Sequence, residues 1–314
     1  MPVTDPIRKR LKTFQQQPRM QAGSLIVSVF GDAIHPRGGM VWLGCLIRLL
    51  EPLALNERLI RTAIFRLVKQ EWLETHTHGR RTDYGLSYTG RSRIEEASKL
   101  IYGGNKLKWD EQWRIILTNP DASLKSRNAL RKALYWQGFG EWNASSFLHP
   151  SADVNQVMAS LHAEGLAQSS DELLTFMSKL ISTPSTIDNK QVVEQAWDLK
   201  HLEQGYRDFL KQYEEISSAL DHQTNAEQAF MLRILLVHDF RRLLLRDPML
   251  PSSLLPASWT GLEARQLFNK LYLQLLEASE EHLETELQRA DESTPKRGLI
   301  FSKRIAAMRA DSKF

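Results

Sequence analysis

The sequence has 314 residues, 42% of them hydrophobic and 25% charged, a composition that excludes a wholly disordered or fibrous protein. The single cysteine, Cys45, excludes an intramolecular disulfide, and no apolar run approaches the roughly 20 residues that span a membrane, so we expect a cytoplasmic protein. The net charge of +4 divides unevenly: residues 1–110 hold 18 Lys and Arg against 10 Asp and Glu (+8), whereas residues 111–314 hold 23 against 27 (−4). This basic first third of the chain indicates contact with a polyanion such as nucleic acid.

The chain begins with a polar segment, which is followed by apolar helices and short turns. We predict that residues 1–22 form a flexible arm and that Ser24–Phe30 and Trp42–Leu50 are helical, because apolar residues dominate these segments at helical spacing. Asn56 is a suitable N-cap for a third helix that ends near Gln70.

A hairpin and a further helix complete this region. Residues 72–78 and 84–89 are rich in strand-forming residues on either side of a turn at Gly79–Asp83, and a helix over 91–102 follows. Three helices followed by a hairpin are the element order of a winged helix-turn-helix. We therefore predict a DNA-binding domain of this kind over residues 23–103.

The predicted helix after Asn56 has two chemically distinct faces. One face is an apolar stripe that packs into a small domain, and it comprises Ile60, Ala63, Ile64, Leu67 and Val68. The other face is rich in cations, and it comprises Arg58, Arg61, Thr62, Phe65, Arg66 and Lys69. Arginine binds guanine edges in the major groove, and cations neutralise phosphates. We predict that this face reads double-stranded DNA, although a solvated basic helix has the same pattern.

The predicted hairpin carries a second group of candidate DNA contacts. Arg80 and Arg81 lie at its tip, and Tyr84 follows on the returning strand. A wing presents such side chains to the DNA backbone or to the adjacent minor groove. Charged residues at a hairpin tip also serve to prevent edge-to-edge pairing of strands, so this reading stays open as well.

The sequence pattern changes after a linker at residues 103–105. Strand-like segments at 113–118, 138–148 and 173–181 alternate with helical segments at 123–136 and 153–163. This order predicts a small ferredoxin-like α+β domain over residues 106–184.

From residue 188 onward the sequence predicts helices almost exclusively. We expect them over 188–220, 225–246, 262–291 and 301–308, with a proline-rich connection between the second and third. The expected fold class is therefore α+β and mostly helical, with a helical C-terminal domain over residues 188–314. The leucines of that domain fit burial within one subunit and burial between two subunits equally well.

Short motifs distributed over roughly residues 20–275 occur together in a specific order. They are Gly38–Gly44, Asn56–Leu67, Gly79–Arg81 with Tyr84, Trp136–Gly140, His238–Leu243, Asp247–Pro251, Leu255–Pro256, Trp259 and Ala264–Arg265. Together they resemble the PaaX family, which represses phenylacetate catabolic operons. The resemblance implies an N-terminal winged helix, a central Cas2-like ferredoxin fold and a helical C-terminal domain. It also implies a homodimer on a palindromic operator, released by phenylacetyl-CoA.

A CoA-thioester effector sets requirements that can be sought in the sequence. Its phosphates need cations, and its acyl group needs an apolar, aromatic wall. The candidate effector-binding residues are Trp136, Phe139, His238, Arg241, Arg242, Arg246 and Trp259, with Trp142 as a further aromatic. The same aromatic residues equally fit a hydrophobic core, and the arginines fit ion pairs with neighbouring aspartates.

The motifs of common enzyme classes are missing from the sequence, including the P-loop and the zinc-protease and hydrolase signatures. We therefore expect neither catalysis nor a metal or other cofactor, and no membrane partner. Two alternatives stay open: the same repressor scaffold responding to another aryl- or acyl-CoA, and a nuclease-like or RNA-binding module built on the central domain.

Overall fold

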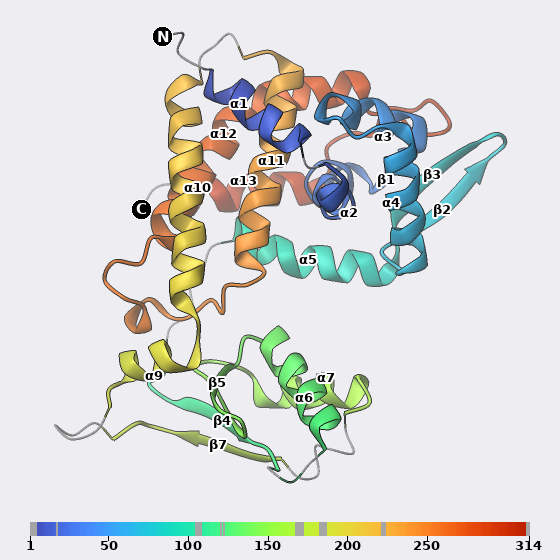
Figure 1. Ribbon diagram of the computed structural model, residues 1–314. Helices are drawn as coiled ribbons and strands as arrows, with labels where there is room; N and C mark the ends of the chain where they lie inside the picture. The colour runs from blue at the N-terminus through green and yellow to red at the C-terminus, as the bar shows by residue number, and fades with distance from the viewer. Residues whose placement is uncertain are drawn as a thin grey trace. The chain divides into compact units, whose positions relative to one another are not determined.

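The computed structural model describes residues 5–16, 18–103, 109–119, 121, 123–166, 173–181, 187–220 and 224–311. The chain forms two compact units, which we treat separately (Figure 1). Unit 1 combines residues 1–104, 206–245 and 261–314, and unit 2 combines residues 105–205 and 246–260. This division differs from three successive domains, because the helices after residue 205 pack on the N-terminal helices. The expected domains over 23–103, 106–184 and 188–314 meet at residues 104–105 and 185–187, most of which lie outside the described residues.

We expected a flexible arm over residues 1–22. This prediction is wrong over Pro6–Gln15, which form helix α1. The Asp5 side chain caps this helix by accepting a hydrogen bond from the Ile7 N–H (3.0 Å). Ile7, Leu11 and Phe14 are buried at positions i, i+4 and i+7, which is the spacing of one helix face. An apolar face of this kind explains why the segment packs in spite of its many charges.

The next part of unit 1 alternates helices with one short strand. Helix α2 (Pro18–Val29) continues into a π-helical turn over Phe30–Ile34 and a 3₁₀ turn over His35–Arg37. The structure contains a strand, β1 (Met40–Trp42), that was not predicted, and it includes Trp42, the first residue of the helix expected over Trp42–Leu50. The elements that follow are α3 (Leu43–Leu50), the 3₁₀ turn Glu51–Leu53 and α4 (Glu57–Lys69).

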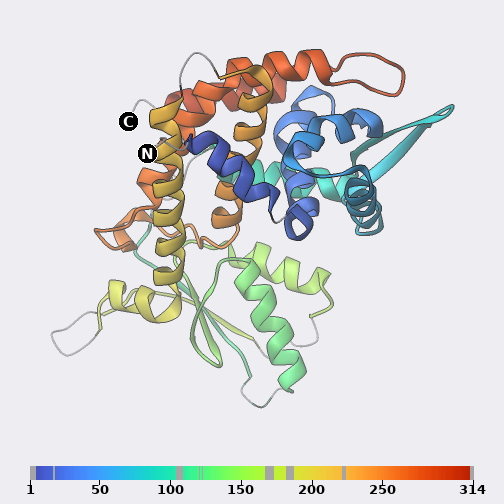
Figure 2. The ribbon, with the colours of Figure 1, turned by 45° about the horizontal axis from the view of Figure 1, so that its top comes forward.

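Strand β1 joins the hairpin in a three-stranded antiparallel sheet of order β1-β3-β2. The hairpin strands are β2 (Leu73–His78) and β3 (Arg81–Leu86), so the returning strand starts three residues earlier than expected. Only Gly79 and Arg80 form the turn, and the φ of +58° at Gly79 explains why such a tight turn is accessible. Figures 1 and 2 both show the hairpin projecting from unit 1 beside α4.

Helix α5 (Tyr88–Tyr102) follows the hairpin, and its first turn packs closely against the backbone of Trp72. A Cβ atom at Gly90 would lie 2.1 Å from the Trp72 carbonyl oxygen, and backbone atoms cannot yield as a flexible side chain does. We expect Gly90→Ala to lower the free energy of unfolding by about 1–3 kcal/mol in urea denaturation. In the matched control Gly23→Ala, within α2, the new Cβ meets no atom within 4 Å. This control should be neutral or slightly stabilising, and equal effects of the two substitutions would contradict the steric argument.

The remaining helices of unit 1 come from the C-terminal half of the chain. They are the larger part of α10 (Leu199–Ala219) and the whole of α11 (Ala226–Leu244), α12 (Gly261–Glu286) and α13 (Leu299–Asp311). The helix expected over 188–220 is interrupted at Trp197 and Asp198, which separate α9 (Asn189–Ala196) from α10. Among the described residues, every helix is too short or too polar to cross a membrane.

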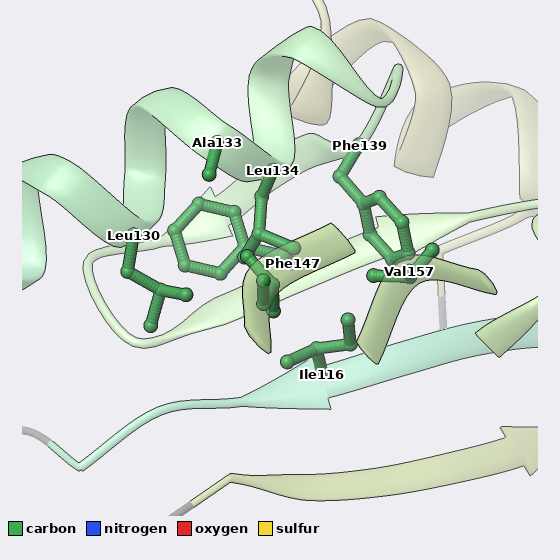
Figure 3. Close-up of a cluster of buried hydrophobic side chains, with 8 residues drawn as sticks. Ile116, Leu130, Ala133, Leu134, Phe139, Phe147 and Val157 are labelled. Carbon is green, nitrogen blue, oxygen red and sulfur yellow. The ribbon is translucent and has the colours of Figure 1, made fainter. Parts of the chain in front are cut away.

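Unit 2 is built on an antiparallel sheet of four strands, in the order β5-β6-β4-β7. Its elements follow the chain as β4 (Trp113–Leu117), α6 (Leu124–Trp136), β5 (Gly140–Asn143), β6 (Ser146–His149), α7 (Val154–Ala163) and β7 (Leu174–Ser178). This βαββαβ order agrees with the expected ferredoxin-like fold, and the bend expected within 138–148 is the β5–β6 connection. Figure 3 shows the core between the helices and the sheet, where Leu134 and Phe139 pack near Ile116.

Candidate nucleic-acid interface

The ends and the inner face of α4 follow directly from its sequence. The Asn56 side-chain oxygen accepts a hydrogen bond from the Leu59 N–H (2.9 Å), which satisfies one free donor at the helix start. Ile60, Ala63, Ile64 and Leu67 are buried, as the apolar stripe predicted. The helix is therefore fixed on unit 1 through one face, and its opposite face is open to solvent.

All six residues predicted for the outer face of α4 are exposed: Arg58, Arg61, Thr62, Phe65, Arg66 and Lys69. The Phe65 side chain is 71% exposed, which leaves its ring available to a partner. Arg61 pairs with Glu57 one turn earlier (2.7 Å), and the Thr62 hydroxyl donates to the Arg58 carbonyl oxygen (2.8 Å). The helix thus presents four cations and one aromatic ring on a single face.

The three residues predicted for the hairpin have different surroundings. Arg80 is exposed in the turn, and Tyr84 is half-buried on β3. The Arg81 guanidinium lies 4.7 Å from the centre of the Trp42 ring and donates to the Glu292 carboxylate (2.9 Å). Arg80 is therefore open to solvent, whereas Arg81 is engaged by two residues from outside the hairpin.

The segment after α12 runs along the three-stranded sheet, which sequence reasoning missed. The Trp42 N–H donates to the Gln288 carbonyl oxygen (3.0 Å), and the Ala290 N–H donates to the buried Asp83 carboxylate (2.7 Å). Together with Glu292, these contacts attach residues 288–292 to both β1 and β3. No local pattern in the sequence signals this attachment, because the partners lie more than 200 residues apart.

A buried charged network lies among the helices of unit 1. Asp32, in the π-helical turn, accepts hydrogen bonds from the Tyr102 hydroxyl (2.7 Å) and the Tyr272 hydroxyl (2.8 Å). The same carboxylate pairs with Arg233 (2.8 Å) and Arg304 (3.0 Å). One carboxylate thus connects α5, α11, α12 and α13.

Glu280 on α12 extends this network. Its carboxylate pairs with Arg233 (2.6 Å) and with Arg37, and all three side chains are buried. Burial alone would raise the pKa of Asp32, but Arg233, Arg304 and the two tyrosine hydroxyls together hold that pKa below its usual value. The isolated charges Asp32 and Arg233, each within an apolar stretch of sequence, were the available signal for a buried pair.

The candidate effector-binding residues are divided between the two units. His238, Arg241 and Arg242 belong to unit 1, whereas Trp136, Phe139, Arg246 and Trp259 belong to unit 2. Neither unit contains all seven candidate effector-binding residues. The sequence could not predict this division, because it does not specify which helices pack together.

Several of these candidate side chains are buried or bonded to other residues of the fold. Phe139 lies in the core of unit 2, which corrects its expected place in a pocket wall. Arg241 is buried and donates to the Ser24 carbonyl oxygen (3.0 Å) and hydroxyl (2.7 Å), and burial lowers its pKa to about 10. Burial likewise lowers the pKa of His238 to about 4. In contrast, Trp136 is 72% exposed, and Arg242 and Arg246 are also exposed.

Unit 2 carries an apolar groove that includes one further predicted aromatic residue, Trp142. The groove has a volume of about 340 Å³ and is lined by Trp113, Ile115, Leu117 and Leu148 on the sheet and by Val192 on α9. The strand register places Ile115 opposite Leu148, and Ile116, one residue further along β4, lies in the core on the other face. The groove therefore lies on the sheet face opposite α6 and α7.

Comparison with known protein families gives three matches in succession. A family described as PaaX-like protein matches residues 21–90, one described as PaaX protein central Cas2-like domain matches residues 106–190, and one described as PaaX-like protein C-terminal domain matches residues 197–285. The last match spans the boundary between the two compact units.

Two individual proteins are similar to this chain, one in sequence and one in fold. The chain is 36% identical over 260 residues to the transcriptional repressor PaaX of Escherichia coli (strain K12), covering 82% of this chain and 81% of that protein. In structure it is similar to the uncharacterized protein Rv0674 from Mycobacterium tuberculosis, with a TM-score of 0.54 and 21% sequence identity. That similarity covers 82% of this chain and 97% of the other, and it shows a shared fold.

Proposed function

This chain belongs to the PaaX family of transcriptional repressors, and we propose that it represses transcription by binding double-stranded operator DNA through a winged helix-turn-helix. In this proposal α3 and α4 are the two helices of the helix-turn-helix, and the β2–β3 hairpin is the wing. The observation that carries the proposal is the outer face of α4, where four cations and an exposed Phe65 lie beside a projecting hairpin.

The chemistry of this face suits the major groove of DNA. The groove admits one helix, and an arginine that meets guanine donates to its O6 and N7 atoms. Cations that do not meet a base still neutralise phosphates and release counterions. An exposed aromatic ring is available for contact with a thymine methyl group.

Arg80 at the turn of the hairpin provides a test for the wing. If this exposed side chain contacts a phosphate, Arg80→Ala should weaken DNA binding and reduce the slope of log affinity against log salt by about one unit. The measurement is a DNA titration at several salt concentrations. An unchanged slope would place the tip of the hairpin away from the DNA backbone.

We extend the proposal to a homodimer on a palindromic operator, released by phenylacetyl-CoA. A dimer would place its two α4 helices in half-sites about one helical turn apart, or a multiple of that distance. The apolar groove of unit 2 supports an acyl-CoA effector, since two indoles and a volume of about 340 Å³ suit an aromatic acyl group. Effector binding must then favour a subunit arrangement that no longer fits the half-site spacing.

The effector is tested on the preformed complex with DNA from upstream of the chain's own coding sequence. We expect phenylacetyl-CoA to release the DNA and free CoA, which lacks the acyl group, to leave the complex intact. Release by CoA alone would contradict recognition of the acyl group. Complexes that withstand the thioester would retain the repressor and overturn this choice of effector.

A further inference from the structure

The wing arginine Arg81 is held in the free protein by residues that lie far from it in sequence. Its guanidinium packs against the Trp42 ring at 4.7 Å and pairs with the Glu292 carboxylate at 2.9 Å. The Trp42 ring packs closely over Gly44, where a Cβ atom would be 2.6 Å from the indole, and the Arg48 guanidinium lies 5.6 Å from its centre. Arg81, the first residue of β3 after the turn, is therefore held by two contacts from outside the hairpin.

Glu292 is delivered to this position by a segment that has its own anchors. The hydrogen bonds from Trp42 to Gln288 (3.0 Å) and from Ala290 to Asp83 (2.7 Å) attach residues 288–290 to β1 and β3. Glu292 lies two residues beyond the second anchor, so its carboxylate does not depend on the ion pair alone for its placement. It is 73% exposed, and Arg81 is 39% exposed.

A carboxylate on a DNA-facing arginine occupies the place that a phosphate would take. Both groups present oxygen atoms to the guanidinium, and they cannot share its donors without strong repulsion between their charges. We propose that Glu292 competes with a DNA phosphate for Arg81 and so sets the affinity of the wing for DNA. This inference rests on the proposed function of the hairpin as a DNA-binding wing.

The expected size of the effect follows from the exposure of the pair. An exposed ion pair stabilises by at most about 1 kcal/mol, which corresponds to about a fivefold change in an equilibrium constant. Glu292→Gln should therefore tighten DNA binding about two- to fivefold at low salt. Arg81→Gln should weaken binding and lower the salt slope by about one unit.

The experiment is a double-mutant cycle on duplex DNA from upstream of the chain's own coding sequence. It compares the full-length wild type with Glu292→Gln, Arg81→Gln and the double variant. Glu281→Gln, an exposed position on α12, controls for the loss of one negative charge elsewhere in unit 1. Thermal unfolding of each variant verifies that the fold is intact.

Competition predicts that Glu292→Gln tightens binding in the wild type but has no effect in the Arg81→Gln background. An equal gain in both backgrounds, or a gain that Glu281→Gln reproduces, would show a general charge effect and overturn the proposal. Wild-type affinity of Glu292→Gln would overturn it as well. Failure of the wild type to bind DNA at all would instead overturn the proposed function from which the inference starts.

Discussion

We expect Asp32→Asn to lower the free energy of unfolding of unit 1 by about 3–5 kcal/mol. The substitution keeps the shape of the side chain but removes the carboxylate charge that pairs with Arg304, and among the described residues it leaves Arg233 paired with Glu280 alone. A buried cation without its partner costs far more than the ion pair contributes, because the protein interior cannot solvate it. The amide would also direct an N–H toward a guanidinium or a tyrosine hydroxyl.

The measurement is hydrogen exchange under increasing urea, followed by mass spectrometry. It reports on the amides of α2 and α11 separately from those of the sheet in unit 2, which serves as an internal reference. Glu281→Gln, at an exposed position on α12 in the same unit, should change stability by less than about 0.5 kcal/mol. Loss of less than about 1 kcal/mol on Asp32→Asn would contradict the assignment of this carboxylate to the network.

The pH dependence of the same variant follows from the direction of the pKa shift. The pKa of Asp32 is lower in the folded protein than in the unfolded chain, so its carboxylate stabilises the fold above about pH 4. That contribution is lost as the pH falls through the folded-state pKa. The difference in stability between the wild type and Asp32→Asn should therefore be largest near neutral pH and should shrink in acid.

The second large effect is expected at Arg61 on the outer face of α4. If its guanidinium reads a base, Arg61→Ala should weaken binding to a specific operator by about 1–3 kcal/mol and relax the preference at one base pair. Alanine is the best helix former, so α4 should persist and the loss should report on recognition. The measurement is a DNA titration against the operator and its single-base variants.

Arg309→Ala is the matched control for this substitution. Arg309 is an exposed arginine on α13 in the same unit, and its replacement removes the same charge without altering α4. The control should bind with nearly wild-type affinity. If Arg61→Ala and Arg309→Ala bind equally well, Arg61 does not read a base.

The outer face of α4 could be predicted from the sequence because the residues that determine it lie in one short segment. A helix whose apolar residues recur every three or four positions must bury that stripe, so the remaining positions face solvent. The cap at Asn56 and the cations that follow it are all within one segment. The order of elements in unit 2 followed in the same way from alternating strand and helix patterns.

The features that sequence reasoning missed depend on contacts between distant segments. Strand β1 has three residues, and its pairing with β3 and with Gln288 determines its conformation more than its own composition does. Helix α1 was predicted to be an arm because charges mask its apolar face. The Asp32 network and the attachment of Glu292 to Arg81 join residues more than 200 positions apart, and no spacing rule connects such positions.

Every expectation about DNA depends on the proposal that the outer face of α4 and the hairpin recognise specific double-stranded DNA. The most direct test is a competition titration of the full-length protein with DNA from upstream of its own coding sequence, against unrelated duplex DNA of equal length, at physiological salt. Because length and charge are matched, phosphate contacts alone would give equal affinities. We expect the upstream DNA to bind at least about 10³-fold more tightly. Equal binding of the two duplexes would contradict it.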